Sequence, residues 1–515
     1  MHLGADLVQH AAPWTAERLD RVPEIDHKLA GLLDHYRAHA EPGRPWKLVL
    51  AGDFVDFIGM SIAPRPETDL GRPLTEDEKV FGLGSARDRA GLKMRRVAER
   101  HDLVFRKLAE FIDAGHSLVV IRGNHDVEFY FPDAREAFVE ALRARRAPDA
   151  MHSDEDFEGH VEFRAWLYYV ENVLYVEHGH QYDENCAHPH VLAPLSPEDP
   201  RHIDYSFADI LLRYIVRPTR GLGTEGHEDR AMIDYLRLFA RLGIIGGPLM
   251  AYRFFRSIVR LFRKWRAHAG ARARGIREAH ERRLHQVADR FRLNVDTLRA
   301  IGSLSATPIT TRALMIMRGV FLDGMLAIVA SVLLVSGLSA SDGVHAALIV
   351  PVALLSGLGI YLWMKSVRVF DPNESLLKGA RHIAEKLPAR YVVMGHTHIP
   401  RIERVAEGTD YVNIGMWSTD ELDDDVVPAP CSHLVIRTGE GEPAATLYSW
   451  DLGEGAKPMF DFSVSGVHPK LPASLPVPTP AEHVATGAES ESRSAVSGAA
   501  EEVAEEADPA SRSAG

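Results

Sequence analysis

The stretch Tyr391–Pro400, YVVMGHTHIP, places two histidines directly after a short apolar run. The run YVVM predicts a buried strand that ends at Gly395, where a polar loop begins. His396 and His398 are two positions apart, so in an extended chain both side chains leave the backbone on the same face. Two imidazoles arranged in this way can bind neighbouring metal ions, and the rest of the chain must supply the other ligands.

The composition limits the kind of protein that could carry such a site. The chain has 515 residues and 46% hydrophobic content, enough for one large domain or two ordinary domains with a core. Its formal net charge of −13 argues against a general nucleic-acid binder, so no nucleic-acid partner is expected. Two cysteines cannot form a disulfide framework, which favours a reducing compartment. The first residues, MHLGADLVQHAAPW, lack the features of a signal peptide, so we expect this part to stay in the cytoplasm.

Two earlier segments repeat the plan of a strand followed by a polar loop. Trp46–Ala51 is a predicted strand that runs into Asp53, with a second acid at Asp56. A carboxylate fixed where a strand ends can bridge two cations, although an acidic turn residue is the alternative for this motif taken alone. The predicted strand Leu118–Ile121 leads into GNHD at Gly123–Asp126. Asparagine offers a neutral carbonyl oxygen to a metal ion, and the adjacent histidine can donate a proton to a leaving oxygen.

A predicted hairpin supplies the fourth unit. Its strands are Val161–Val170 and Asn172–Asp183, it turns at Glu171, and it delivers His178 and His180. A single histidine after a strand is more often a surface or core residue, but four units of this kind together favour a shared site. Strand ends at one edge of a sheet are where α/β folds usually bind their ligands. The apolar spacing also predicts helices at 13–40 and 94–114, and the second is followed by a glycine at its C-terminal end.

Together the four motifs resemble the signature of the calcineurin-like metallophosphoesterase superfamily. They are GD-x-x-D at 52–56, GNHD at 123–126, HGH at 178–180 and GHTH at 395–398, and their order also matches. The resemblance covers about residues 1–190 and 375–452. It implies an α+β fold with four layers (α/β/β/α), in which a β-sandwich is flanked by helices and a dinuclear metal centre lies at the strand ends.

The resemblance also implies roles for particular residues. The metal ligands would be His2 and His398 for the first ion, Asn124, His178 and His396 for the second ion, and Asp53 as the bridge between them. His125 would lie near the phosphate as a proton donor or charge stabiliser. The residues that would orient the ligands from behind are Asp56, Asp126 and His180. We expect two divalent cations, manganese first and iron, zinc or nickel as alternatives.

The chemistry implied is hydrolysis of a phosphoester or pyrophosphate bond. Two ions about 3.5–4 Å apart can polarise a phosphoryl group and supply a hydroxide nucleophile at neutral pH.

The sequence departs from the family at its first motif, which is Asp-x-His at the end of the first strand. The chain begins MHLG, so His2 aligns with the histidine of that motif and its aspartate has no counterpart. Either the true start lies upstream, or one ligand of the first metal and a core strand are missing. We favour an upstream start, because every later ligand is present and the loss of a central strand would expose a sheet edge. If the chain is as given, we expect weak metal binding at the first site.

An insertion at 191–374 separates the HGH and GHTH motifs. Within it, Tyr252–Trp265 places apolar residues on one helical face and basic residues around the other, which suits a helix lying in a membrane surface. An ordinary packed helix with a solvated basic face is the alternative. Gly324–Ala340 and Val344–Met364 are apolar runs that approach or reach the roughly 17–25 residues of a spanning helix. The flanking basic residues predict a transmembrane hairpin at about 324–364 with both ends in the cytoplasm, and a buried hairpin in a soluble protein is the alternative.

The sequence therefore predicts a phosphohydrolase anchored in the inner (cell) membrane, with its catalytic domain on the cytoplasmic side. That domain would comprise 1–190 and 375–468, followed by a disordered acidic tail at 469–515. The insertion is similar in position to the lid of the UDP-2,3-diacylglucosamine pyrophosphatases, so a lipid-linked phosphoester or pyrophosphate is the expected substrate. The alternatives are a phosphodiesterase or phosphatase acting on soluble nucleotides, and a non-catalytic scaffold with a degraded metal site.

Overall fold

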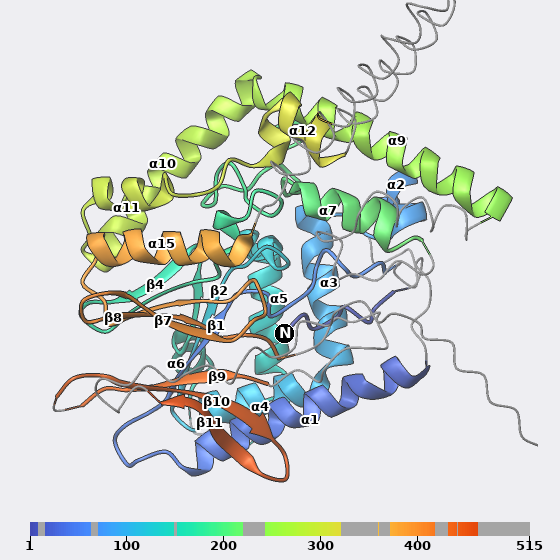
Figure 1. Ribbon diagram of the computed structural model, residues 1–515. Coiled ribbons are helices and arrows are strands. Elements are labelled where there is room, and N and C mark those ends of the chain that lie inside the picture. The colour runs from blue at the N-terminus through green and yellow to red at the C-terminus, as the bar shows by residue number, and fades with distance from the viewer. Residues whose placement is uncertain are drawn as a thin grey trace, which may run out of the picture. The chain divides into compact units, whose positions relative to one another are not determined.

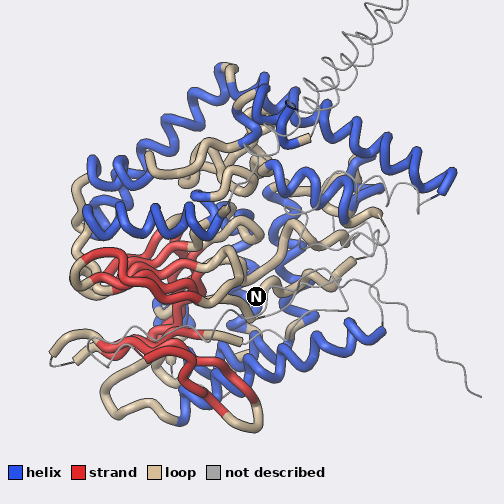
Figure 2. Tube along the Cα trace, viewed as in Figure 1, coloured by secondary structure: helices blue, strands red, loops and turns tan. Residues whose placement is uncertain are grey.

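The computed structural model describes residues 1–8, 16–62, 71–148, 152–219, 243–320, 359, 371–417, 431–439 and 441–461. In this part of the chain the fold is a mixed α/β arrangement of helices and three open sheets, with no closed barrel (Figures 1 and 2).

The elements have the following bounds. The strands are β1 (Lys47–Ala51), β2 (Ser117–Ile121), β3 (Val161–Arg164), β4 (Leu167–Val170), β5 (Leu174–Glu177), β6 (Tyr391–Met394), β7 (Arg401–Ala406), β8 (Thr409–Asn413), β9 (His433–Arg437), β10 (Ala444–Asp451) and β11 (Gly455–Asp461). The α-helices are α1 (Ala16–Ala38), α2 (Glu76–Phe81), α3 (Arg87–Arg100), α4 (Asp102–Asp113), α5 (Pro132–Arg143), α6 (Asp154–Gly159), α7 (Phe207–Leu211), α9 (Gly243–His268), α10 (Ala271–Phe291), α11 (Val295–Gly302), α12 (Ala313–Gly319) and α15 (Pro372–Lys386). The short 3₁₀ and π turns are η2 (Val127–Tyr130), η3 (His180–Tyr182), η4 (Leu212–Val216) and η5 (Ile309–Thr311).

The first sheet contains β1, β2 and β3, all parallel. Lys47 of β1 pairs with Ser117 of β2, and Leu118 of β2 pairs with Val161 of β3. The predicted strands at 46–51 and 118–121 are confirmed to within one residue, because their nearly continuous apolar sequence is typical of strands buried on both faces.

The second sheet has the order β4-β5-β6-β8-β7. β4 and β5 form an antiparallel hairpin, while β5 pairs in parallel with β6 and β6 in parallel with β8. The predicted hairpin is correct only from Leu167 onward: Val161–Arg164 belongs to the first sheet, so the chain crosses between sheets before Leu167. Asn172 adopts a positive φ of 61° in the β4–β5 turn, as asparagine tolerates in such turns.

The first and second sheets share a core. Val119 and Ile121 of β2 pack with Val176 of β5, Val393 of β6 and Val412 of β8. On its other face the first sheet packs against α3, α4 and α5. The second sheet packs against α10, α11 and α15, and Figure 1 shows α15 running across this sheet. Helices therefore cover the outer faces of both sheets.

The last three strands form a separate antiparallel sheet. β10 pairs with β9 on one side and β11 on the other. Leu447 and Ala445 of β10 contribute to the core between the first and second sheets, so this sheet extends that core.

The helix predicted at 94–114 is in fact two helices, α3 and α4, which separate at His101. The His101 side chain is only 3% exposed, donates from Nδ1 to Asp26 of α1 (2.8 Å) and accepts from the Gly4 amide (3.0 Å). Its backbone (φ −107°, ψ 40°) leaves the helical region, because the ring points into these contacts. The predicted C-terminal glycine is confirmed: Gly115 has a φ of 88° just past the end of α4.

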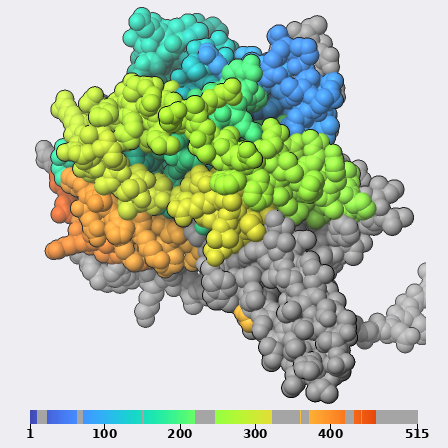
Figure 3. All heavy atoms as spheres, turned by 90° about the horizontal axis from the view of Figure 1, so that it is seen from above, coloured from blue at the N-terminus to red at the C-terminus, as the bar shows by residue number. Residues whose placement is uncertain are grey.

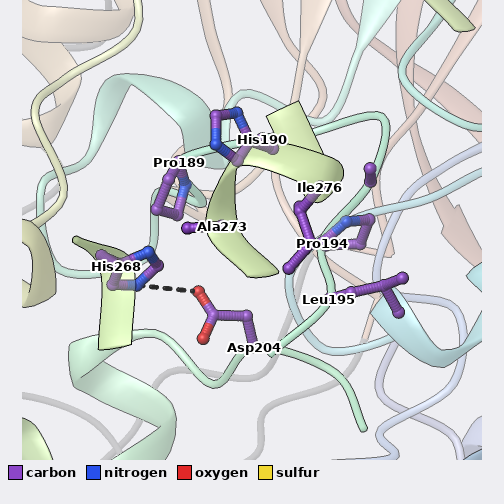
Figure 4. Close-up of a pocket in the computed structure, with 9 residues that line it drawn as sticks. Pro189, His190, Pro194, Leu195, Asp204, His268, Ala273 and Ile276 are labelled. Carbon is purple, nitrogen blue, oxygen red and sulfur yellow. Dashed lines mark ion pairs between the residues drawn. The ribbon is translucent and has the colours of Figure 1, made fainter. Parts of the chain in front are cut away.

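Ion pairs connect helix α9 of the insertion to the loop between η3 and α7. Asp204 of that loop forms ion pairs with Lys264 (2.7 Å) and His268 (3.4 Å) of α9. Figure 4 shows the His268 pair at the edge of a small cavity that is also lined by His190 and Ile276. The helix predicted at 252–265 is confirmed as part of α9, which ends shortly before Gly270.

The predicted transmembrane hairpin at about 324–364 lies outside the described residues, except for Gly359. None of the helices in the described part combines the length and apolar character needed to cross a membrane. The longest, α9, carries Arg253, Arg256, Arg260 and Arg263 between its apolar residues. The prediction of a transmembrane helix is corrected accordingly. The acidic tail at 469–515 also lies outside the described residues.

Replacing His101 should destabilise the protein more than replacing an exposed histidine. His101→Ala removes two hydrogen bonds and leaves the buried Asp26 carboxylate without its imidazole donor, so we expect a loss of about 2–3 kcal/mol in the free energy of unfolding. Urea denaturation followed by circular dichroism measures the loss. His27→Ala on the exposed side of α1 is the control. Equal stability of the two variants would contradict this account.

Candidate metal centre

Strand ends from the first and second sheets converge on the Asp53 carboxylate. Asp53 follows β1, Asn124 follows β2, and His178 follows β5. Asp53 Oδ2 lies 3.0 Å from His178 Nε2, and the same nitrogen lies 3.0 Å from Asn124 Oδ1. All three side chains are buried. The structure therefore brings together the predicted bridging carboxylate and two predicted ligands of the second metal.

The hydrogen bonding of His178 fits a metal ligand. Its Nδ1 lies 2.9 Å from the carbonyl oxygen of Ala51, which can only accept, so Nδ1 carries the proton. Nε2 then faces two oxygens that also carry lone pairs. Such a set is stable only with a positive charge among the three atoms, either a second proton on His178 or a metal cation. Although burial alone lowers the pKa of His178, the Asp53 carboxylate raises it above the usual value.

Two glycines allow the backbone to approach these ligands closely. A Cβ atom on Gly52 would lie 2.4 Å from His178 Nδ1, and one on Gly123 would lie 2.2 Å from Asp53 Oδ1. Gly52 also has a φ of 90°. The glycines that precede Asp53 and Asn124 in the two motifs are therefore required by the site itself.

Several predicted ligands have an unusual backbone conformation. The structure describes seven non-glycine residues with positive φ, and four of them are predicted metal ligands: His2 (57°), Asp53 (53°), His396 (68°) and His398 (61°). Such conformations carry strain and tend to gather at functional sites.

His2 and His398 lie on the other side of Asp53. The His2 ring is 5.5 Å from the His398 ring between centroids, and His2 Nε2 is 3.8 Å from Asp53 Oδ2. The backbone holds this position, because His2 N donates to the Asp53 carbonyl and Leu3 forms a parallel bridge with Val55. Burial keeps the pKa of His2 well below its usual value, so the ring is neutral, as a ligand requires.

The carboxylates of Asp56 and Asp126, which were predicted to orient the ligands, accept hydrogen bonds from other protein groups. Asp56 Oδ1 accepts from His125 Nδ1 (2.9 Å) and from the Gly59 amide (2.6 Å). Asp126 accepts from the amides of Gly123 (2.6 Å) and Phe54 (2.9 Å). His2, Asp56 and His125 could in principle hold an ion between them. We assign Asp56 to orienting His125, because its oxygens are already engaged.

His125 belongs to this group through both its backbone and its ring. Its amide donates to Asp53 Oδ1 (2.8 Å), and its ring packs edge-on against His2, with 4.3 Å between centroids. His180 lies farther back: its ring is 5.4 Å from that of His178 and 6.5 Å from that of His396. Both rings therefore lie beside predicted metal ligands.

Asp183 was not among the residues predicted for the site. Its Oδ2 accepts from His396 Nε2 at 3.1 Å, and the carboxylate is held by the amide (2.8 Å) and the side chain (3.1 Å) of Asn185. The 3₁₀ turn η3 reverses the chain after Gly179 and returns Asp183 to the site. Cys186 lies close enough to Asp183 and His396 for the three to form a possible metal-binding group. The only signal in the sequence was an acid five residues beyond His178.

The chain has no match among protein-family models, curated proteins or solved structures. The fold and the site by themselves define a mixed α/β protein with a candidate centre for divalent metal ions.

Asp183 should determine the affinity of the site for one metal ion. Removing a carboxylate that orients a histidine ligand typically weakens metal binding by 10–100-fold. We therefore expect Asp183→Ala to weaken one of two Mn²⁺ binding steps by about 10–100-fold, and Asp183→Asn to weaken it less. Calorimetric titration of metal-stripped protein measures both steps.

The matched control is Asp289→Ala, which removes an exposed carboxylate on α10. Identical titration curves for the Asp183 and Asp289 variants would show that Asp183 does not support a ligand.

Proposed function

We propose that the protein is a metal-dependent phosphohydrolase that cleaves a phosphoester or pyrophosphate bond. The observation that carries the proposal is the convergence of Asp53, Asn124 and His178 within 3.0 Å contacts at one edge of the sheets. His2, His396 and His398 lie around them. The four motifs resemble those of the calcineurin-like metallophosphoesterases, and two packed sheets with helices on both outer faces agree with the four-layer fold of that superfamily.

The ligand set fits two divalent ions, with manganese as the first candidate. Asp53 would bridge them, His2 and His398 would hold one, and Asn124, His178 and His396 would hold the other. Imidazole nitrogens together with carboxylate and amide oxygens suit Mn²⁺, Fe²⁺, Zn²⁺ and Ni²⁺ better than softer ions. When bound, the two ions supply Lewis-acid activation of the phosphoryl group and of the attacking water.

The protein itself supplies the proton transfer. Asp56 accepts from His125 Nδ1, so the ring is fixed with Nε2 left to exchange a proton with the leaving oxygen. Burial opposes ionisation of Asp56, but His125 and Arg217 lower its pKa below the usual value, so the carboxylate stays charged.

We propose a lipid-linked substrate because of the outer face of α9. Leu249, Tyr252, Phe255 and Val259 are exposed at helical spacing, with Phe255 at 63%. Exposed Arg256 lies among them. Figure 3 shows α9, α10 and α12 together on one face of the protein. Aromatic and basic side chains in this pattern suit peripheral contact with anionic headgroups, here those of the inner (cell) membrane.

The central test is hydrolysis by purified protein that has been loaded with Mn²⁺. We expect turnover of bis(4-nitrophenyl) phosphate and of a dialkyl phosphodiester. His125→Ala should reduce turnover of the dialkyl ester, whose leaving group needs a proton, by about 100-fold or more while leaving metal content nearly unchanged. His27→Ala is the control. Unchanged turnover in His125→Ala would refute its role, and no hydrolysis by the wild-type protein with any metal would favour the non-catalytic scaffold.

The substrate class can be tested separately. We expect faster turnover of a polyprenyl diphosphate in anionic mixed micelles than of soluble nucleoside diphosphate sugars. Phe255→Ser should slow the micellar reaction and leave the soluble one unchanged, because only the micellar reaction uses the α9 face.

Val170→Ser, which changes an exposed apolar residue at the end of β4, is the matched control. Faster turnover of soluble nucleotides than of the lipid diphosphate would overturn the lipid assignment in favour of a nucleotide phosphodiesterase or phosphatase.

A further inference from the structure

An arginine from the insertion reaches the carboxylate that orients His125. Arg217 directly follows the π-helical turn η4 and is only 6% exposed. Its Nη2 lies 3.4 Å from Asp56 Oδ2, on the oxygen that His125 does not use. The Arg217 Nε atom is buried and has no hydrogen-bond partner among the described residues. No feature of the sequence had connected this residue with the GD-x-x-D motif.

The segment that carries Arg217 is held in place by other contacts. Arg213, one turn earlier, donates to the carbonyl oxygens of Leu83 (3.1 Å) and Gly82 (2.7 Å). Tyr214 bonds to Asp77 of α2 (3.0 Å). From the insertion, Arg253 of α9 donates to the Pro218 carbonyl at 2.7 Å. Arg217 is therefore presented from a fixed backbone and does not depend on Asp56 for its position.

Asp56 and Arg217 are closely packed against Gly59. A Cβ atom on Gly59 would lie 1.9 Å from Asp56 Oδ2 and 2.4 Å from Arg217 Nη2. Asp56 itself is fully buried. A buried carboxylate that loses its cationic partner is strongly destabilised and either takes up a proton or moves. In either case it becomes a poorer acceptor for His125.

We propose that Arg217 is a positioning residue, through which the insertion fixes the orientation of His125 by way of Asp56. The inference rests on the proposed function, because it concerns proton donation to the leaving group. The contacts form one chain from α9 to the catalytic histidine: Arg253 holds the Pro218 carbonyl, Arg217 pairs with Asp56, and Asp56 accepts from His125. The insertion is thus part of the catalytic apparatus as well as a substrate-binding element.

Leaving groups of different basicity test the proposal in the Mn²⁺-loaded full chain. A poor leaving group needs a proton from His125, whereas 4-nitrophenolate leaves almost without one. Arg217→Ala should therefore slow turnover of a dialkyl phosphodiester, which has only poor leaving groups, by about tenfold or more. It should slow turnover of bis(4-nitrophenyl) phosphate much less. Arg217→Lys, which keeps the charge, should restore part of the loss. A merely structural arginine would slow both substrates equally.

The controls separate folding from positioning. Arg282→Ala removes an exposed arginine of α10 and should leave both rates unchanged. If Arg217→Ala does not fold, Arg217→Gln keeps the length of the side chain without the charge and takes its place. Thermal unfolding and metal content are measured for each variant.

Crystal structures of the metal-free variants test the position of His125 independently of any activity measurement. We expect the 2.9 Å contact between His125 Nδ1 and Asp56 Oδ1 to be lost in Arg217→Ala and kept in Arg217→Lys. A retained contact together with an equal slowing of both substrates would overturn the proposal. If the wild-type protein hydrolyses nothing, the proposed function fails, and the crystal structures still decide whether Arg217 positions His125.

Discussion

The negative charge of Asp53 is the constraint that the arrangement of the first and second sheets has to satisfy. Its carboxylate is 3% exposed, and an uncompensated charge at such a depth costs several kcal/mol. The compensating groups come from different strand ends: the His125 amide follows β2, and the His178 ring follows β5. His178 is in turn tied to the Ala51 carbonyl at the end of β1. The edge of one sheet is therefore fixed to the edge of the other through hydrogen bonds as well as apolar packing.

His125 connects the two halves of the site. Its amide donates to the carboxylate expected to bridge the metal ions, while its ring donates to Asp56. A shift of the loop after β2 would therefore disturb both the metal ligands and the proton donor. The position before Asn124 in this loop is a glycine, Gly123, because a side chain there would collide with Asp53. The predicted metal ligand Asn124 and the proposed proton donor His125 therefore lie on one loop.

The sequence predicts best those features that depend on residues close together in the chain. The strands β1, β2 and β6 were predicted from short apolar runs, and the structure brings the predicted residues Asp53, Asn124 and His178 together. Prediction from the sequence fails where a feature depends on contacts between residues that are far apart in the chain. The break at His101 depends on Asp26 and Gly4, and β3 leaves the predicted hairpin to pair with β2. Asp183 contacts His396 and Arg217 contacts Asp56, and only the folded chain brings these residues together.

The parallel pairing of β5 with β6 has a consequence for biosynthesis. These neighbouring strands are separated in sequence by the whole insertion, so their contact has a high contact order. A ribosome adds about 5–20 residues per second, so the edge of β5 stays unpaired on the order of tens of seconds after it emerges. An exposed strand edge of this kind is prone to intermolecular pairing. The nascent chain thus passes through a period in which chaperone protection of β5 would raise the yield of folded protein.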